Sequence, residues 1–473
     1  MRRNASPVMP PRRHDGPGTA CTMIPSTSPM RRSRLPLRQR GQAMIFGIFV
    51  LLGAAVATFY LFNTGQMTAE KTKLVNTADA VAYSAGVMHA RALNFGAYTN
   101  RALIANEAAI AQMVSISSWL QYAQGHVRGV RPLACYTQYS VPVALATLEY
   151  IPLCYALSYP AGYVAVEYAN TAFNGANVGA AIVMRAELAK EQLKAMQTLM
   201  FFGVTAARLS VMNDVAEANY GDGSRVSVDT VPLKDDWNVF DDNRPFINKR
   251  RTNGNERARM KAAIEEAVYK DNFVRERAWD SKSPWPCSIP IGEATRTGRT
   301  VLNGYNSWQA NDSANFRVRA WRGIIPRCRT TRTYGLGSGS RQASASAAWR
   351  YSGVPEFYEL SDTALGYKPS NADPDKREAR LRFAIRLTRA NGETKTSGNK
   401  SGIKPTGRLE VFDSAAAGGV LAAVATSEVF FDHERLDGST ELGSLFNPYW
   451  QVHLVGNSAA SVAAAVARQG ATP

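Results

Sequence analysis

The first marked pattern along the chain is a run of apolar residues that contains neither a charge nor a proline. Residues 43–62 read AMIFGIFVLLGAAVATFYLF, twenty residues in all. At about 1.5 Å per residue, a helix of this length spans the roughly 30 Å hydrocarbon core of a bilayer. The run predicts one transmembrane helix, because a cleaved signal peptide has a shorter apolar region followed by a small-residue cleavage site.

Helical periodicity continues beyond this run, and no proline occurs from Met44 to Val130. A heptad pattern with two core positions per repeat can be written over residues 74–120. One core position holds Leu74, Val81, Met88, Phe95, Ala102, Ala109 and Ile116, and the other holds Ala78, Ala85, Ala92, Thr99, Asn106, Met113 and Leu120. The pattern predicts a long helix continuous with the span, packed along an alanine-rich seam against a second helix or a coiled-coil partner.

A second proline-free helical stretch follows at 161–219. Its apolar face comprises Leu188, Ala195, Leu199, Phe202, Ala206 and Leu209, and we expect it to supply the packing partner of the first helix. The segment 141–159 between the two stretches is apolar enough for a second span, but Glu149, Pro142 and Pro152 argue against one. The two stretches therefore predict a helical hairpin with a structured tip.

After residue 220 the pattern becomes strand-like. Strands are predicted at 225–231, 315–321, 381–387, 408–412 and 450–455, helices within 253–279 and at 458–468, and exposed Gly/Ser-rich loops at 335–346 and 391–402. The expected fold class is α+β: a single N-terminal transmembrane helix that continues into a long helical hairpin, followed by an ectodomain that contains an antiparallel sheet.

Charge sets the expected orientation. The first forty residues hold nine arginines and one aspartate, within a formal net charge of +17 for the chain. Positive charge beside a span stays in the cytoplasm. The expected domains are a disordered basic cytoplasmic leader at 1–40, the transmembrane helix at 41–63, an extracytoplasmic hairpin stalk at 64–220 and an α+β extracytoplasmic domain at 221–473. Met30 is an alternative start to Met1.

Four of the five cysteines lie on the expected extracytoplasmic side, where disulfides persist. They are Cys135, Cys154, Cys287 and Cys328, and Cys21 lies in the leader. The preferred connectivity among three joins near neighbours, Cys135 with Cys154 and Cys287 with Cys328. Four buried thiols are the alternative interpretation.

The sequence contains none of the common catalytic signatures HExxH, GxSxG, GxxxxGK[ST] or an EF-hand loop. We therefore expect no enzyme activity, no cofactor and no metal site. The adjacent pair His433 and Glu434 is interpreted as a solvated turn. The carboxylates Asp235, Asp236, Asp241 and Asp242 are interpreted as a solvated acidic surface segment.

Residues 38–86 contain RQRGQAMIFGIFVLLGAAVATFYLFNTGQ followed by LVNTADAVAYSAG. This region resembles the N-terminal region of TadG-like proteins of the Tad (Flp, type IVc) pilus system. The residues that carry the resemblance are Arg40, Gly41, Gln42, Asn76, Ala78, Asp79 and Ala80. The resemblance implies a non-enzymatic bacterial inner-membrane protein with an extracytoplasmic body, whose partners are pilus-assembly or pilin proteins.

Two departures limit what the resemblance implies. Prepilins of this class carry a glutamate at the fifth residue after the cleavage glycine, and this position counted from Gly41 is Phe46. Processing at Gly41 is therefore not expected. The von Willebrand A metal motif DxSxS of some relatives is also missing from the sequence.

Two further expectations concern partners. Ala43 with Gly47, and Gly53 with Ala57, stand four residues apart in the span and could admit a partner helix. The alternative function is an envelope-anchored binding module for an acidic polymer or extracellular DNA, suggested by the basic ectodomain. Specific recognition of nucleic acid is not expected.

Overall fold

A computed structural model of the chain describes most of its residues. The described residues are 40–130, 160–221, 226–237, 246–250, 257–282, 287, 291–323, 327–361, 364, 378–390, 393, 419–434, 438 and 441–470. Two compact units are present, Met1–Phe62 and Asn63–Pro473. The expected leader, the hairpin tip, the strand at 408–412 and the pair Cys135 and Cys154 lie outside the described residues.

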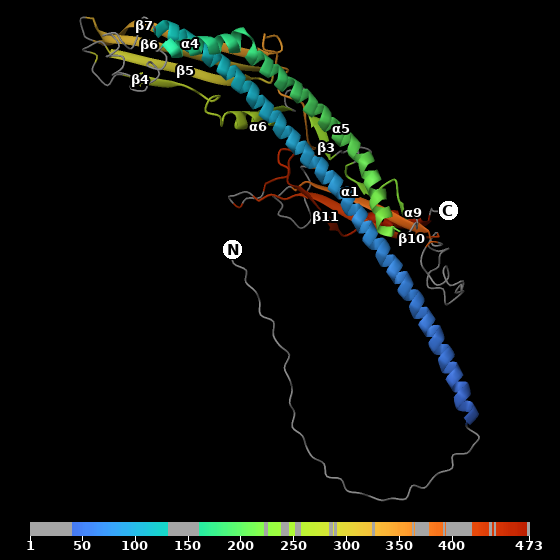
Figure 1. Ribbon diagram of the computed structural model, residues 1–473. Coiled ribbons are helices and arrows are strands. Elements are labelled where there is room, and N and C mark those ends of the chain that lie inside the picture. The colour runs from blue at the N-terminus through green and yellow to red at the C-terminus, as the bar shows by residue number, and fades with distance from the viewer. Residues whose placement is uncertain are drawn as a thin grey trace, which may run out of the picture. The chain divides into compact units, whose positions relative to one another are not determined.

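The longest element is helix α1, Arg40–Val130, with 91 residues (Figure 1). It begins at the predicted span and passes without a break into the second unit, so the prediction of one long N-terminal helix is confirmed. The mixture of helices and antiparallel sheets is confirmed as well.

The buried face of α1 follows a different period from the predicted heptad. Residues spaced by eleven are all buried: Leu74, Ala85, Gly96, Glu107 and Ser118 in one row, Ala78, His89, Asn100, Ala111 and Tyr122 in a second, and Val81, Ala92, Leu103 and Val114 in a third. Heptad positions such as Met88, Phe95 and Ala102 are only half-buried. One predicted core row is thus only half-buried from Met88 onward, whereas Ala92, Thr99 and Leu120 of the other row are buried. The heptad drifts from the buried face because a straight helix follows 11/3 residues per turn more closely than 7/2.

The second helical stretch is divided. Helix α4, Pro160–Asn170, passes into a single π-turn, η3, Thr171–Gly175, and then into helix α5, Val178–Tyr220. Asn177 interrupts the stretch with a φ of 60°, and Gly221 ends α5 in the left-handed conformation. Within the second unit α5 packs against α1, where Gln197 donates a hydrogen bond of 2.9 Å to Oγ1 of Thr99.

The face of α5 that packs inward is not the one predicted from its apolar residues. Leu188, Leu199 and Phe202 are 57%, 74% and 73% exposed. The inward face instead combines Val183, Ala186, Phe201, Val204, Met212 and Ala216 with the polar residues Lys190, Gln197 and Arg208. The prediction failed because this face buries its polar groups with partners supplied by α1 and by the strands, which a hydrophobic pattern cannot register.

Three antiparallel sheets share cores with the two helices. The strands are β1 Ser227–Val228, β2 Lys234–Asp235, β3 Ile247–Arg250, β4 Trp279–Lys282, β5 Ile291–Asn303, β6 Ser307–Arg322, β7 Arg327–Ser344, β8 Phe357–Leu360, β9 Arg380–Ala390, β10 Val420–Phe431 and β11 Trp450–Val455. The sheet orders are β1-β9-β10-β11 with β2 also on β9, then β3-β8, and β4-β5-β6-β7. Helices α6, Ala258–Val268, and α9, Ala459–Gly470, complete the fold.

Each sheet shares a core with α1. Leu74 and Ala78 of α1 pack with Phe383 of β9 and Leu421 of β10. Farther along the helix, the core contains Leu103 and Ile110 of α1, Val183 of α5, Ile264 of α6 and Trp308 of β6. Residues from both expected parts, 64–220 and 221–473, therefore contribute to the same cores.

The prediction of an exposed loop at the Gly/Ser-rich segment 335–346 was wrong, because most of this segment belongs to strand β7. A Cβ at Gly339 would lie 2.0 Å from the carbonyl oxygen of Ser118, and one at Gly337 would lie 2.5 Å from the backbone nitrogen of His126. The glycines allow this strand to run directly against the backbone of α1. The predicted strand at 450–455 coincides with β11.

Candidate functional site

The start of α1 is an apolar surface that nothing in the described chain covers. Met44, Phe46, Phe49, Leu51 and Leu61 are between 69% and 73% exposed, and a window of this helix has a mean hydropathy of 2.4 with none of it buried. The hydroxyl of Thr58 donates to the carbonyl of Ala54 at 2.8 Å, so its polar group is satisfied within the helix. A helix that is apolar on all sides fits a lipid environment.

Helix α5 is also long and apolar enough to cross a membrane, with a window hydropathy of 1.2 that is 28% buried. Its exposed face holds Leu188, Met196, Leu199 and Phe202. Its inward face, however, holds polar groups with specific partners. Helix α5 is therefore apolar on one side only, unlike the start of α1.

The predicted signature residues occupy two places on α1. Arg40, Gly41 and Gln42 form the first turn of the helix. Ala78 is fully buried in the core with β9 and β10, Ala80 is half-buried and Asn76 is exposed. The side chain of Asn76 lines a shallow hollow that it shares with Thr68, Thr72 and Asn219.

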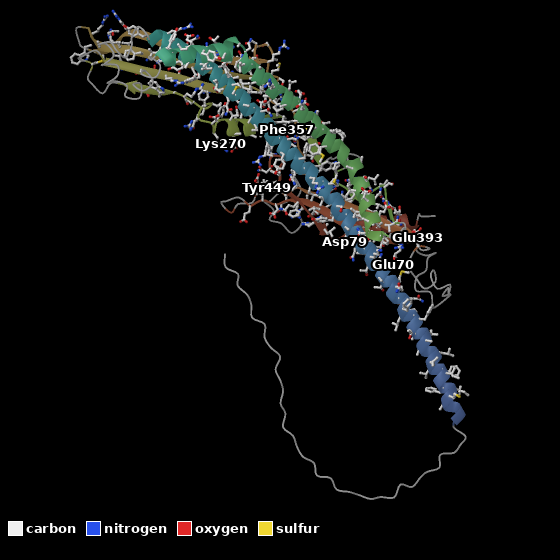
Figure 2. The ribbon with its side chains drawn as sticks, in the orientation of Figure 1. Glu70, Asp79, Lys270, Phe357, Glu393 and Tyr449 are labelled. Carbon is white, nitrogen blue, oxygen red and sulfur yellow. A yellow bond between two sulfur atoms is a disulfide. The ribbon has the colours of Figure 1, made fainter. Side chains whose placement is uncertain are left out.

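Asp79 differs from its neighbours in the signature. It lies on α1 (Figure 2) and is half-buried, and this partial burial raises the pKa of its carboxyl group. Asp79 makes no hydrogen bond and no ion pair with any other described residue. A carboxylate that is partly desolvated without compensation is a candidate contact for a partner.

A buried polar cluster joins α1, α5 and β2. Arg208 donates one hydrogen bond of 2.9 Å to Nε2 of His89 and another of 2.7 Å to Oδ2 of Asp235. The ring of His89 stacks on Trp237 with a centroid distance of 5.1 Å. Burial, together with the positive charge of Arg208, holds the pKa of His89 well below its usual value. The imidazole is therefore neutral and accepts the bond from the guanidinium.

This geometry corrects one interpretation of the sequence. Asp235 is 2% exposed, so it is not part of a solvated acidic segment. It pairs with Arg208 because the two-residue strand β2 brings it against α5. Asp241 and Asp242 lie outside the described residues.

A second buried cluster centres on Glu107 of α1. Lys190 Nζ lies 2.5 Å from Glu107 Oε1, and Glu107 Oε2 accepts hydrogen bonds from Trp308 Nε1 at 2.9 Å and Tyr351 OH at 2.8 Å. Lys190 also donates to Glu187 Oε1 at 2.7 Å and to the carbonyl oxygen of Gly353 at 3.0 Å. The buried ammonium group thus has two hydrogen-bond acceptors and an ion pair with Glu107, which compensate for its burial.

Further polar contacts are distributed along α1. Glu70 pairs with Arg389 of β9 at 3.0 Å, Asn100 donates to the carbonyls of Tyr358 and Leu445, and Ser118 donates to Asp312 at 2.8 Å. Asn100 and Ser118 belong to the buried rows spaced by eleven residues, and Glu70 stands eleven residues before Val81 of the third row. They fix the position of α1 against each sheet and carry no catalytic arrangement of their own.

The structure joins Cys287 to Cys328 by a disulfide across a separation of 41 residues. This is one of the two pairs preferred from the sequence. Of the pair His433 and Glu434, interpreted as a solvated turn, Glu434 is exposed and His433 is half-buried. His433 Nδ1 contacts Glu441 Oε2 at 3.0 Å, and its ring stacks on Tyr449 at 3.9 Å. Among the described residues, no three His, Cys, Asp or Glu side chains are grouped to hold a metal ion.

Comparison with known proteins adds one finding. Residues 41–92 match the Tad family, described as "Putative Flp pilus-assembly TadE/G-like". No curated protein and no solved structure matches the chain. The match contains the exposed apolar start of α1 and the signature residues from Gly41 to Ala80. The family is associated with pilus assembly rather than with catalysis. Residues 41–92 are therefore similar to the Tad family, as the signature residues predicted.

Proposed function

We propose that this protein is a non-enzymatic component of Tad (Flp) pilus assembly or anchoring, held in the bacterial inner membrane by one helix. The observation that carries the proposal is the coincidence of the Tad match at 41–92 with a helical segment that is uncharged and exposed on every side. The basic residues before the span favour a cytoplasmic N-terminus, with the bulk of the chain in the periplasm.

A single span is proposed although two helices are long and apolar enough. Lys190 and Arg208 of α5 are 1% and 4% exposed and have partners on α1, β2 and the segment before β8. Moving α5 into lipid would break these contacts and leave charges in hydrocarbon, which is costly. The outward face of α5 is better suited to contact with apolar helices of other assembly proteins.

Two parts of the Tad region have separate roles in this proposal. Residues 43–62 anchor the chain, while Asn76 and Asp79 present polar groups at the start of the extracytoplasmic part. Ala78 keeps the helix narrow where β9 and β10 pack against it. In this proposal 1–40 is the cytoplasmic leader and 41–63 the membrane anchor. Residues 64–220 and 221–473 form the extracytoplasmic part and share its cores.

The experiment is an in-frame deletion of the gene in its bacterium, scored by counting surface Flp pili. We expect pili to be lost and to return with the full chain. Residues 63–473 exported behind a cleavable signal should not restore them, because the anchor is missing. Asp79→Asn should restore fewer pili at normal protein level, whereas Asp214→Asn, an exposed change on α5, should restore them fully. Normal piliation after the deletion would refute the proposal.

A further inference from the structure

The end of the β6–β7 hairpin gathers arginines that form no ion pair with a carboxylate of the described residues. No Asp or Glu occurs in the sequence from 313 to 355, whereas the two strands contribute six arginines between 317 and 332. Arg322, Arg327, Arg329 and Arg332 are all exposed. We refer to these four residues as the arginine face.

Register places all four on one side of the sheet. Arg322 lies opposite Arg327, Ala320 opposite Arg329, and Val318 opposite Arg332. Directly opposed residues of an antiparallel pair point to the same side, and alternate residues of one strand share a side. The pairs at Val318, Ala320 and Arg322 therefore present their β7 partners to a common surface.

A bulge produces this arrangement. Arg329 and Arg332 are three residues apart, so a regular strand would turn them to opposite sides. The register shifts between Val318 and Arg319, which adds one residue to β7 at this point. The extra residue restores Arg332 to the side of Arg329, and bulges are known to re-aim side chains in this way.

The other side of the same hairpin is different. Arg317 lies opposite Glu293 of β5, and Arg319 lies 3.7 Å from the same carboxylate. The β5 residues on the arginine face near Val318 and Phe316 are Gly292 and Ala294, which carry no charge. One side of the hairpin is thus balanced by a carboxylate and the other is not.

The arginine face does not serve the stability of the sheet. Two like charges placed directly opposite each other destabilise a strand pair, and Arg322 faces Arg327 in this way. No ion pair involves any of the four arginines within the part of the chain that the structure describes. Arg332 donates one hydrogen bond of 3.5 Å to Tyr334 OH, but among the described residues none of the four positive charges is balanced by a carboxylate. A costly arrangement of unbalanced charges is suited to an external anion.

We propose that the arginine face binds a phosphate-bearing polyanion. Opposed guanidinium groups, with Cβ atoms about 4.5 to 5.5 Å apart, can grip one anionic group from two directions. A tetrahedral phosphate offers oxygens in several directions, whereas the two oxygens of a carboxylate lie in one plane. The three arginines of β7 extend along the strand for about 16 Å at roughly 3.3 Å per residue, and Arg322 lies beside them on β6. The four residues therefore fit an extended polymer better than a single small ion.

The proposal is independent of the pilus assignment and concerns a separate part of the chain. It gives the alternative function considered from the sequence, binding of an acidic polymer, a definite location. The arginine face would contact phosphate groups and not bases, and contacts to phosphate carry no information about nucleotide sequence. Binding should therefore be strongly dependent on salt and indifferent to nucleotide sequence.

The test uses the full chain in nanodiscs of phosphatidylcholine, which has no net charge. Binding of long-chain inorganic polyphosphate and of a fluorescent DNA duplex is measured as a function of salt. The variant Arg327→Gln with Arg329→Gln should bind about tenfold or more weakly, and the slope of log K against log salt should fall by about two. The matched control, Arg317→Gln with Arg319→Gln, removes equal charge from the other side and should bind within about twofold of the parent.

A stability measurement separates a binding surface from a structural one. Loss of Arg327 and Arg329 should leave the unfolding midpoint unchanged or raise it, because it relieves repulsion. Equal weakening by both variants would show a general charge effect and overturn the proposal. Equal or tighter binding of poly-glutamate at the same salt would overturn the assignment to phosphate. A lack of measurable binding to either phosphate polymer would overturn the site altogether.

Discussion

Two exposed apolar helical surfaces of this protein differ in what lies behind them. In the first, residues 43–62 of α1, large side chains such as Phe46 and Leu51 are about 70% exposed and no charge occurs on any side. In the second, the outward face of α5, Leu199 and Phe202 are exposed to a similar degree. Behind them, however, are Lys190, Gln197 and Arg208, all buried and all with partners.

The difference shows that exposure and hydropathy alone do not identify a membrane span. Lipid surrounds a spanning helix, so every side must tolerate hydrocarbon. A helix that serves a protein interior may be apolar outside and polar inside, because its polar groups find partners in the fold. By this criterion 43–62 fits lipid, and α5 fits a protein core on one side and an apolar partner on the other.

The largest expected effect comes from placing charges in each surface. Leu51→Arg with Leu52→Arg puts two charges at the centre of 43–62 and should raise the apparent free energy of insertion by about 5 to 7 kcal/mol. An alkaline phosphatase fused after Asn219 should be active in the parent and silent in this variant. Carbonate extraction should release the variant from the membrane.

The matched change on α5 is Leu199→Arg with Phe202→Arg. If α5 lies outside the bilayer, phosphatase activity and membrane retention should both remain at the level of the parent. Loss of retention from the α5 variant alone, with none from the α1 variant, would reverse the comparison and assign the span to α5.

Sequence patterns were reliable for elements whose signal is local. The long helix from 43 onward, strand β11 and the terminal helix α9 follow from proline-free or alternating runs that need no knowledge of their neighbours. The Tad signature could likewise be found from about fifty residues of sequence. These features depend on the backbone and on composition more than on tertiary contacts.

The buried polar clusters could not be predicted in the same way. A heptad assigns the core to apolar positions and leaves out His89, Asn100 and Glu107, which an eleven-residue repeat would have placed in the same rows as Leu74 and Ala78. Asp235 could not be matched to Arg208 because the pairing depends on a two-residue strand. The repeat was visible in the sequence, but the partners required the fold.

The next largest expected effect is a loss of stability when a buried charge on the inward side of α5 is removed, compared with a more exposed charge on the same helix. Lys190→Met removes the cation that pairs with Glu107, a side chain that is 0% exposed. An unpaired buried carboxylate should lower the free energy of unfolding by about 3 to 5 kcal/mol. Lys194→Met is the control: its ion pair with Glu191 is more exposed, so its loss should cost less than about 1 kcal/mol. Urea denaturation of the full chain in mild detergent measures both.

A compensating change distinguishes this electrostatic cause from simple loss of packing. Lys190→Met combined with Glu107→Gln removes both charges and should recover part of the lost stability. If the double variant is as unstable as the two single changes added together, the pair contributes through packing alone. The inward face of α5 would then resemble an ordinary apolar core, and the comparison with 43–62 would weaken.

The smallest expected effect is a pH dependence that also belongs to the inward face of α5. Since the folded state lowers the pKa of His89, protonation favours the unfolded chain, and stability is lost as the pH falls below about 6.5, the usual value for histidine. Between pH 7 and pH 5 this loss amounts to up to about 2 kcal/mol. His89→Gln keeps an oxygen acceptor for Arg208 but does not titrate. The unfolding midpoint of this variant should therefore decline less between pH 7 and pH 5 than that of the parent. Above pH 7.5 the difference between the two midpoints should be constant. Equal slopes for both proteins would show that His89 can be protonated without leaving its site, and that the guanidinium of Arg208 is not held against it in solution.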